Sequence, residues 1–66
     1  MKILVQTMSC QHCVAQITKA VQALDKQATV RCDLDAKLVD VQSTATPDSV
    51  LAAIAEADYP AILQAS

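Results

Sequence analysis

The order of apolar periodicities along the chain is the feature that most restricts its fold. Residues 2–7, KILVQT, alternate apolar and polar side chains as a half-buried strand does, with Ile3 and Val5 on one face. Residues 12–25 instead repeat apolar side chains every three or four positions, which is typical of an amphipathic helix. The stripe comprises Val14, Ile17, Val21 and Leu24. A strand followed directly by a helix is therefore expected.

The second part of the chain shows a related pattern. Residues 28–34 and 38–43 alternate again, and the Asp-Ala-Lys stretch between them suits a turn, which predicts an antiparallel hairpin. A second helix is expected to begin at Pro47, because the threonine before it can cap the helix and proline suits the first helical position. Pro60 ends any helix near it, and residues 59–63 are predicted to form a short edge strand.

These elements give the order strand, helix, strand, strand, helix, strand. That order is the split βαβ arrangement of ferredoxin-like folds. The predicted fold class is therefore α+β, with a four-stranded antiparallel sheet, both helices on one face and a largely polar opposite face. A chain of 66 residues is expected to form one domain over residues 1–66. The chain contains no glycine, and Asp58 is the candidate for a left-handed backbone conformation.

Composition excludes several classes of protein. The net charge is −2 and the five Lys and Arg residues are scattered among seven acidic ones, so nucleic acid is not an expected partner. No apolar run approaches the roughly 20 residues that span a bilayer, and no targeting segment is visible, so we expect a cytoplasmic protein that is not inserted into a membrane. Three cysteines do not fit a secreted disulfide scaffold. Reduced thiols indicate metal binding, redox chemistry or simple burial.

Cys10 and Cys13 form a Cys-x-x-Cys pair between the first strand and the first turn of the first helix. Unpaired N–H groups and the dipole at a helix start stabilise a thiolate, which is the form that binds metal. Two soft sulfur ligands suit a soft ion of low coordination number, above all Cu(I), whereas a structural zinc site needs four ligands. The other candidates are poorly placed, because His12 should point away from the pair and Cys32 should alternate into the core.

The stretch TMSCQHCVAQITKAV resembles the Met-x-Cys-x-x-Cys site of the heavy-metal-associated domain family, most closely its small bacterial copper chaperones. The similarity covers nearly the whole chain, including the VRCDLDAKLVDV hairpin and the SVLAAIAEADY helix. It implies a non-enzymatic domain that binds Cu(I) through Cys10 and Cys13. It also implies delivery by ligand exchange to a copper-transporting P-type ATPase, at that protein's metal-binding domain or where the ion enters the membrane. Met8 is implied to be a buried support, and Tyr59 to lie on a loop that faces the site.

Four residues near the pair have two interpretations each. Met8 is a buried apolar residue or a weak thioether ligand. His12 is an exposed residue at the helix start or an extra ligand in a copper-bridged homodimer. Cys32 is a small buried hydrophobic residue or a ligand. Tyr59 is a core residue with a solvated hydroxyl or a group that tunes the ligands from beside them.

Thr7 and Asp58 stand where the family usually has glycine, which concerns the shape of the loops and not the ligands. Three other functions stay open at this point. The first is storage or detoxification of another soft ion such as mercury or silver. The second is thiol–disulfide exchange, although that chemistry is typical of a thioredoxin-like pattern. The third is a regulatory domain of a larger ATPase. The position of Met1 directly before the first strand favours a separate protein over such a domain.

Overall fold

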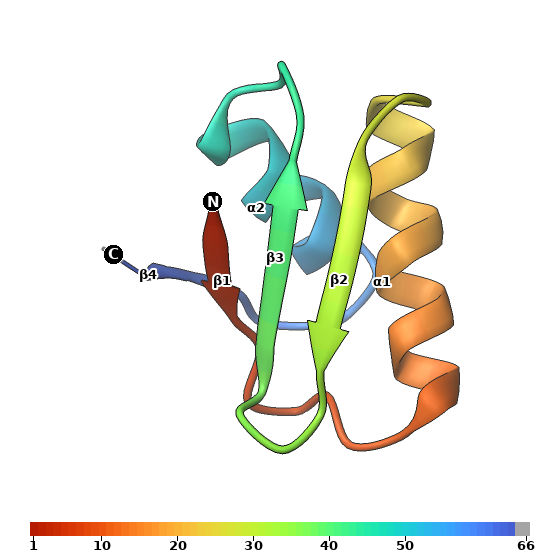
Figure 1. Ribbon diagram of the computed structural model, residues 1–66, viewed down its shortest axis with the longest axis vertical. Coiled ribbons are helices and arrows are strands. Elements are labelled where there is room, and N and C mark those ends of the chain that lie inside the picture. Colours follow the sequence, from red (N-terminus) through yellow and green to blue (C-terminus); the bar gives the residue numbers. More distant parts are fainter. Residues whose placement is uncertain (65–66) are drawn as a thin grey trace.

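The computed structural model describes residues 1–64 and contains the predicted order of elements (Figure 1). The strands and helices are β1 (Lys2–Leu4), α1 (Gln11–Leu24), β2 (Thr29–Asp33), β3 (Leu38–Gln42), α2 (Pro47–Glu56) and β4 (Ile62–Gln64). The sheet has the order β2-β3-β1-β4, and all neighbouring strands are antiparallel. Both helices lie on the same face of the sheet (Figure 1). The predicted α+β, ferredoxin-like fold is confirmed.

The core lies between the sheet and the two helices. Strand register brings inward-facing side chains together, because Ile3 lies opposite Val39 and Val30 lies opposite Val41. The buried hydrophobic residues are Ile3, Val5, Met8, Ile17, Val21, Ala28, Val39, Val41, Val50 and Ile54. Burial of each larger member stabilises the fold by about 1.5–3 kcal/mol relative to exposure, before the cost of ordering the chain. An aliphatic core thus fixes α1 and α2 on the sheet.

The first strand is shorter than predicted. β1 ends at Leu4 and not at residue 7, because the chain turns there and the Met8 N–H donates to the Val5 carbonyl at 3.1 Å. The Val5 N–H still donates to the carbonyl of Lys37, at 2.8 Å. The turn leads the chain away from the sheet and toward the start of α1.

The last strand begins later than predicted, at Ile62 and not at residue 59. The Tyr59 N–H donates back to the Ile54 carbonyl at 3.3 Å, which ties this residue to the end of α2. β4 pairs with β1 and lies at the edge of the sheet, as predicted. Leu24 was predicted to be buried but is 44% exposed, because it is the last residue of α1.

Two residues adopt the left-handed conformation that glycine would favour. Asp58 has φ 71°, as predicted, and Lys37 has φ 60°. A left-handed non-glycine residue costs roughly 1–2 kcal/mol, so the surrounding structure must hold both turns. The predicted cap of the second helix is also present, since the Ser49 N–H donates to the Thr46 hydroxyl oxygen at 3.2 Å.

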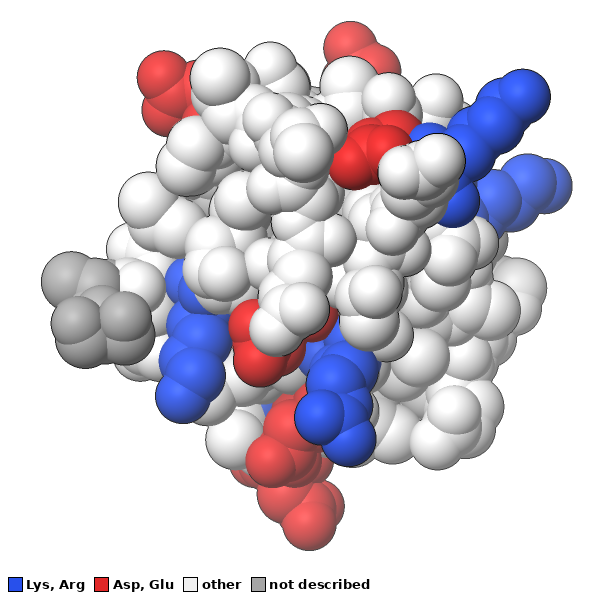
Figure 2. Space-filling model, turned by 45° about the horizontal axis from the view of Figure 1, so that its top comes forward, with Lys and Arg blue, Asp and Glu red and all other residues white. Residues whose placement is uncertain are grey.

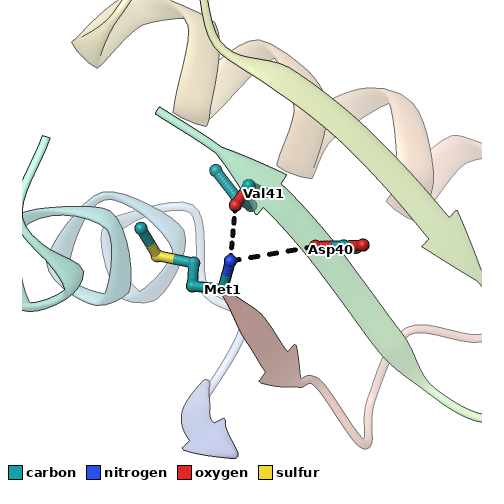
Figure 3. Close-up of polar contacts among 3 residues, drawn as sticks. All are labelled: Met1, Asp40 and Val41. Atoms are coloured by element: carbon teal, nitrogen blue, oxygen red, sulfur yellow. Dashed lines mark hydrogen bonds and ion pairs between the residues drawn. The ribbon is translucent and has the colours of Figure 1, made fainter. Parts of the chain in front are cut away.

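Pairing between β1 and β3 extends to the first residue of the chain. The α-amino group of Met1 donates to the Val41 carbonyl at 2.8 Å and lies 3.8 Å from the Asp40 carboxylate (Figure 3). The Val41 N–H donates in return to the Met1 carbonyl at 2.8 Å. These contacts fix the beginning of β1, and thus the strand that leads into the cysteine loop.

The surface carries mixed charge. Basic and acidic side chains are interspersed on the face shown in Figure 2. No helix within residues 1–64 combines the length and the apolar character needed to cross a membrane.

Candidate metal-binding site

The two motif cysteines meet at the start of α1. Cys10 is the N-cap residue, with extended backbone (φ −154°, ψ 168°), and its carbonyl accepts the first helical hydrogen bond, from the Val14 N–H at 3.2 Å. Cys13 is the third residue of the helix and is half-buried, whereas Cys10 is exposed. Their sulfur atoms lie 3.3 Å apart. The predicted placement, with Cys10 before the helix and Cys13 in its first turn, is confirmed.

The surroundings of Cys13 favour its thiolate. Its pKa is lowered from 9.0 to about 6, chiefly by a hydrogen bond with the Tyr59 hydroxyl, then by hydrogen bonds from the Ser9 backbone and the Cys10 side chain. The same hydrogen bond with Cys13 is the main reason that the pKa of Tyr59 is raised to about 12. The first turn of α1 holds no acidic residue whose negative charge would repel a thiolate. At neutral pH, Cys13 is therefore ready to act as a nucleophile or metal ligand.

Lys37, in the turn between β2 and β3, contacts the loop between β1 and α1 that leads to Cys10. The Lys37 ammonium group donates to the Met8 carbonyl at 2.7 Å, and the Lys37 carbonyl accepts from the Val5 N–H. Met8 itself is fully buried in the core, as the first of its two interpretations predicted. The backbone two residues before Cys10 is thus held both by core packing and by a charge-assisted hydrogen bond.

Tyr59 connects the loop after α2 with the cysteine end of α1. Its ring is half-buried and packs against the core, and its hydroxyl donates to Oε1 of Gln16. Gln16 follows Cys13 by three positions, so both lie on the same face of α1. The ring of Tyr59 therefore belongs to the edge of the core, and its hydroxyl lies at the cysteine end of α1.

His12 and Cys32 lie outside this cluster. His12 is exposed at the second position of α1, as predicted. Cys32 faces inward on β2 opposite Val39, but it is only half-buried because β2 is an edge strand. Burial raises the pKa of the Cys32 thiol, although a hydrogen bond with Thr18 acts in the other direction. Within residues 1–64, no three His, Cys, Asp or Glu side chains are grouped so that they could hold a metal ion.

Sequence reasoning missed Gln16 and Lys37. Gln16 fell on the polar side of the predicted helix, and Lys37 was read as part of a turn. Each contacts a residue far away in the sequence, by 43 positions for Gln16 and 29 for Lys37. Only the register of the folded elements brings these partners together, so no local signal could have identified them.

Comparison with known proteins agrees with this geometry. The sequence model of the heavy-metal-associated domain matches residues 2–60, and the chain therefore belongs to the heavy-metal-associated domain family. The fold and this family define the chain as a metal-trafficking protein that is not an enzyme. A search of curated protein sequences finds no match.

Three solved structures illustrate the similarity. The copper chaperone Atx1 from Synechocystis PCC6803, in its Cu2 form, is 37% identical, with a TM-score of 0.91 over 94% of this chain and 98% of that one. A gold binding protein is 33% identical, with a TM-score of 0.89 over 92% and 94% of the two chains. A heavy metal binding protein from Thermotoga maritima is 35% identical, with a TM-score of 0.75 over 92% and 91%. These proteins share the fold of this chain, and they are described as a copper chaperone, a gold binding protein and a heavy metal binding protein.

Proposed function

We propose that the protein is a cytoplasmic copper chaperone. It binds Cu(I) through Cys10 and Cys13 and delivers the ion by ligand exchange to a copper-transporting P-type ATPase. The observation that carries this proposal is the pair of sulfur atoms 3.3 Å apart at the start of α1, one of them with a lowered pKa. Membership of the heavy-metal-associated domain family supports it. The proposal treats residues 1–66 as one such domain.

The chemistry of two thiolates explains why this site suits transfer. Two thiolates bring two negative charges, and one Cu(I) neutralises one of them. An ion held by two sulfur ligands keeps room for a third, and soft thiolates favour Cu(I). A cysteine of the partner can therefore join the ion before Cys10 or Cys13 leaves it. The ion passes through a shared intermediate and is never released into water.

The exposure of Cys10 supports the direction of approach. Cys10 and His12 are both exposed at the start of α1, so an incoming partner meets this end of the helix first. The partner surface is the metal-binding domain of the ATPase, or the place where the ion enters the membrane. A second copy of this chain can approach in the same way and share copper, with His12 as a ligand in the homodimer.

Other soft metal ions are alternative ligands for the same site, after Cu(I). A gold binding protein is among the similar structures, and mercury and silver share the preference of Cu(I) for thiolates. Thiol–disulfide exchange would also use a close pair with a lowered pKa. We favour metal transfer because the similar solved structures include a copper chaperone, a gold binding protein and a heavy metal binding protein.

Transfer under competition tests this function. Under anaerobic conditions, the chain is loaded with one equivalent of Cu(I) and mixed with the soluble metal-binding domain of a copper ATPase, in the presence of a chromogenic Cu(I) chelator. We expect copper to reach the domain faster than the chelator signal rises. The matched control adds the same amount of Cu(I) to the Cys10→Ser/Cys13→Ser chain, which should leave the ion to the chelator. A chelator signal that rises as early with the loaded parent as with this control would contradict delivery by ligand exchange.

A further inference from the structure

The Tyr59 hydroxyl has one proton and two acceptors within reach. It donates to Oε1 of Gln16, which lies one helical turn after Cys13 on the same face of α1. The Cys13 sulfur is the second acceptor, because a hydrogen bond with this hydroxyl is the main cause of the lowered pKa of Cys13. A hydroxyl donates a single hydrogen bond at a time, and therefore Gln16 and Cys13 compete for it.

We propose that Gln16 is a positioning residue that holds the Tyr59 ring beside the Cys10–Cys13 pair and so restricts the access of competing ligands to the bound metal. This inference rests on the proposed function. It assigns a role to a glutamine that neither the motif nor the composition of the site indicates.

The amide of Gln16 suits this role because it can both accept and donate. When the tyrosine donates to the amide oxygen, Gln16 holds the hydroxyl directly, as in this structure. When Cys13 accepts the tyrosine proton instead, the amide N–H₂ can donate to the phenol oxygen. A thiolate or metal-bound sulfur is the stronger acceptor, because hydrogen bonds to charged groups are roughly twice as strong as neutral ones. Gln16 therefore keeps its contact with Tyr59 in both states of the site.

The backbone around Tyr59 explains why such a contact is needed. The residue lies between Asp58, in the left-handed conformation, and Pro60, outside any helix or strand. Its ring packs at the edge of the core and is only half-buried. The hydrogen bond to Gln16 joins this loop to α1 across 43 positions of sequence. Without it, packing alone fixes the ring.

A double-mutant cycle tests the proposal. Gln16→Leu and Tyr59→Phe each remove one partner, and Gln22→Leu is the matched control, because it makes the same change at another exposed position of α1. The readout is the rate at which a Cu(I) chelator captures copper from the loaded chain. We expect Gln16→Leu and Tyr59→Phe each to speed capture by about threefold to tenfold, the range of a single hydrogen bond. The double variant should be no faster than the faster single variant.

Two results would overturn the proposal. One is a Gln16→Leu capture rate equal to that of Gln22→Leu, and the other is an additive effect in the double variant. The metal-free chain gives a second readout, because Tyr59 is its only tyrosine and it has no tryptophan. Acrylamide should quench the fluorescence of Tyr59 more strongly in Gln16→Leu than in Gln22→Leu, and equal quenching also counts against the proposal. If the parent chain fails to bind Cu(I) while this difference persists, the proposed function fails and the Gln16–Tyr59 contact stands.

Discussion

Cys13 and Cys32 are the same residue type in two regions that affect the thiol in opposite ways. At the start of α1, hydrogen bonds from Tyr59, the Ser9 backbone and Cys10 lower the pKa of Cys13 to about 6. On β2, partial burial raises the pKa of Cys32 above its ordinary value. The difference lies in the surroundings of each sulfur, because the Tyr59 hydroxyl is the main group that stabilises the Cys13 thiolate, whereas burial of Cys32 outweighs its hydrogen bond with Thr18. This difference supports the proposal that Cys13 is a metal ligand and that Cys32 serves packing.

The pH dependence of thiol alkylation should separate the two cysteines most widely. In the metal-free parent chain, the alkylation of Cys13 should have its midpoint near pH 6, and that of Cys32 should lie above the midpoint of an ordinary free thiol. At pH 7.5 Cys13 should therefore be mostly thiolate, whereas Cys32 should remain mostly a neutral thiol. Peptide-resolved mass spectrometry over a pH series measures both midpoints in one sample. A Cys13 midpoint at or above about 8.5, the value of a free thiol, would remove the contrast.

Tyr59→Phe should reduce the contrast, because it removes the largest cause of the lowered pKa. The Cys13 midpoint should move up toward 9.0 while that of Cys32 stays in place.

The lowered pKa of Cys13 should also stabilise the folded parent chain, by an amount that grows as the pH rises from about 6 to about 9. A lowered folded-state pKa stabilises fully above the unfolded value, and the effect is lost as pH falls through the folded value. Urea unfolding at several pH values should show a flatter profile for Tyr59→Phe, and an unchanged slope would contradict the assignment.

Tyr59→Phe keeps the ring, so it should leave one-to-one copper binding intact. Tyr59→Ala removes the ring as well and should speed copper capture by a chelator more than Tyr59→Phe does. Equal capture rates for Tyr59→Ala and the parent would mean that Tyr59 serves only the core.

Lys37→Met tests whether the contact of Lys37 with the loop before Cys10 stabilises the fold. It removes the 2.7 Å hydrogen bond to the Met8 carbonyl but keeps a long side chain. We expect the free energy of unfolding to fall by about 1–2 kcal/mol, because a partly buried, charge-assisted hydrogen bond is lost. Lys19→Met, at an exposed position of α1, is the control. Indistinguishable urea midpoints for the two variants would show that the Lys37 contact contributes nothing.

His12→Ala should have the smallest effect on the site itself. The residue is exposed at the start of α1, so its removal should leave one-to-one copper binding unchanged. Copper-dependent dimerisation should weaken, because a ligand from the homodimer is lost. Sedimentation of the metal-free and Cu(I)-loaded chains measures this, and unchanged dimerisation would return His12 to a solvated surface residue.

The sequence predicted the parts of the structure that are encoded locally. Apolar periodicity identified both helices and the first three strands, since each repeat reports which face of an element is buried. The last strand was predicted from the position of Pro60. The Cys-x-x-Cys spacing placed Cys10 and Cys13 correctly, because both belong to one continuous turn. Asp58 could be assigned a left-handed conformation in a chain that lacks glycine.

The parts that depend on tertiary packing could not be predicted in this way. Alternation on β2 placed Cys32 inward but could not show that an edge strand leaves it half-buried. The contacts of Gln16 with Tyr59 and of Lys37 with Met8 join distant segments, and polar residues of this kind usually lie in solvent. The end of β1 and the beginning of β4 depend on turns, and the backbone hydrogen bonds of these turns do not require particular residue types.

The central claim is that the thiols at the start of α1, and not the third thiol, hold the ion. Anaerobic Cu(I) titration against a competing chelator, with Cys10→Ser, Cys13→Ser and Cys32→Ser compared with the parent, tests it most directly. We predict that either motif variant loses most of its Cu(I) affinity. Cys32→Ser should retain the parent affinity and lose only stability, because it places a hydroxyl in an apolar position. A Cys32→Ser chain that loses copper as completely as Cys13→Ser would contradict the account.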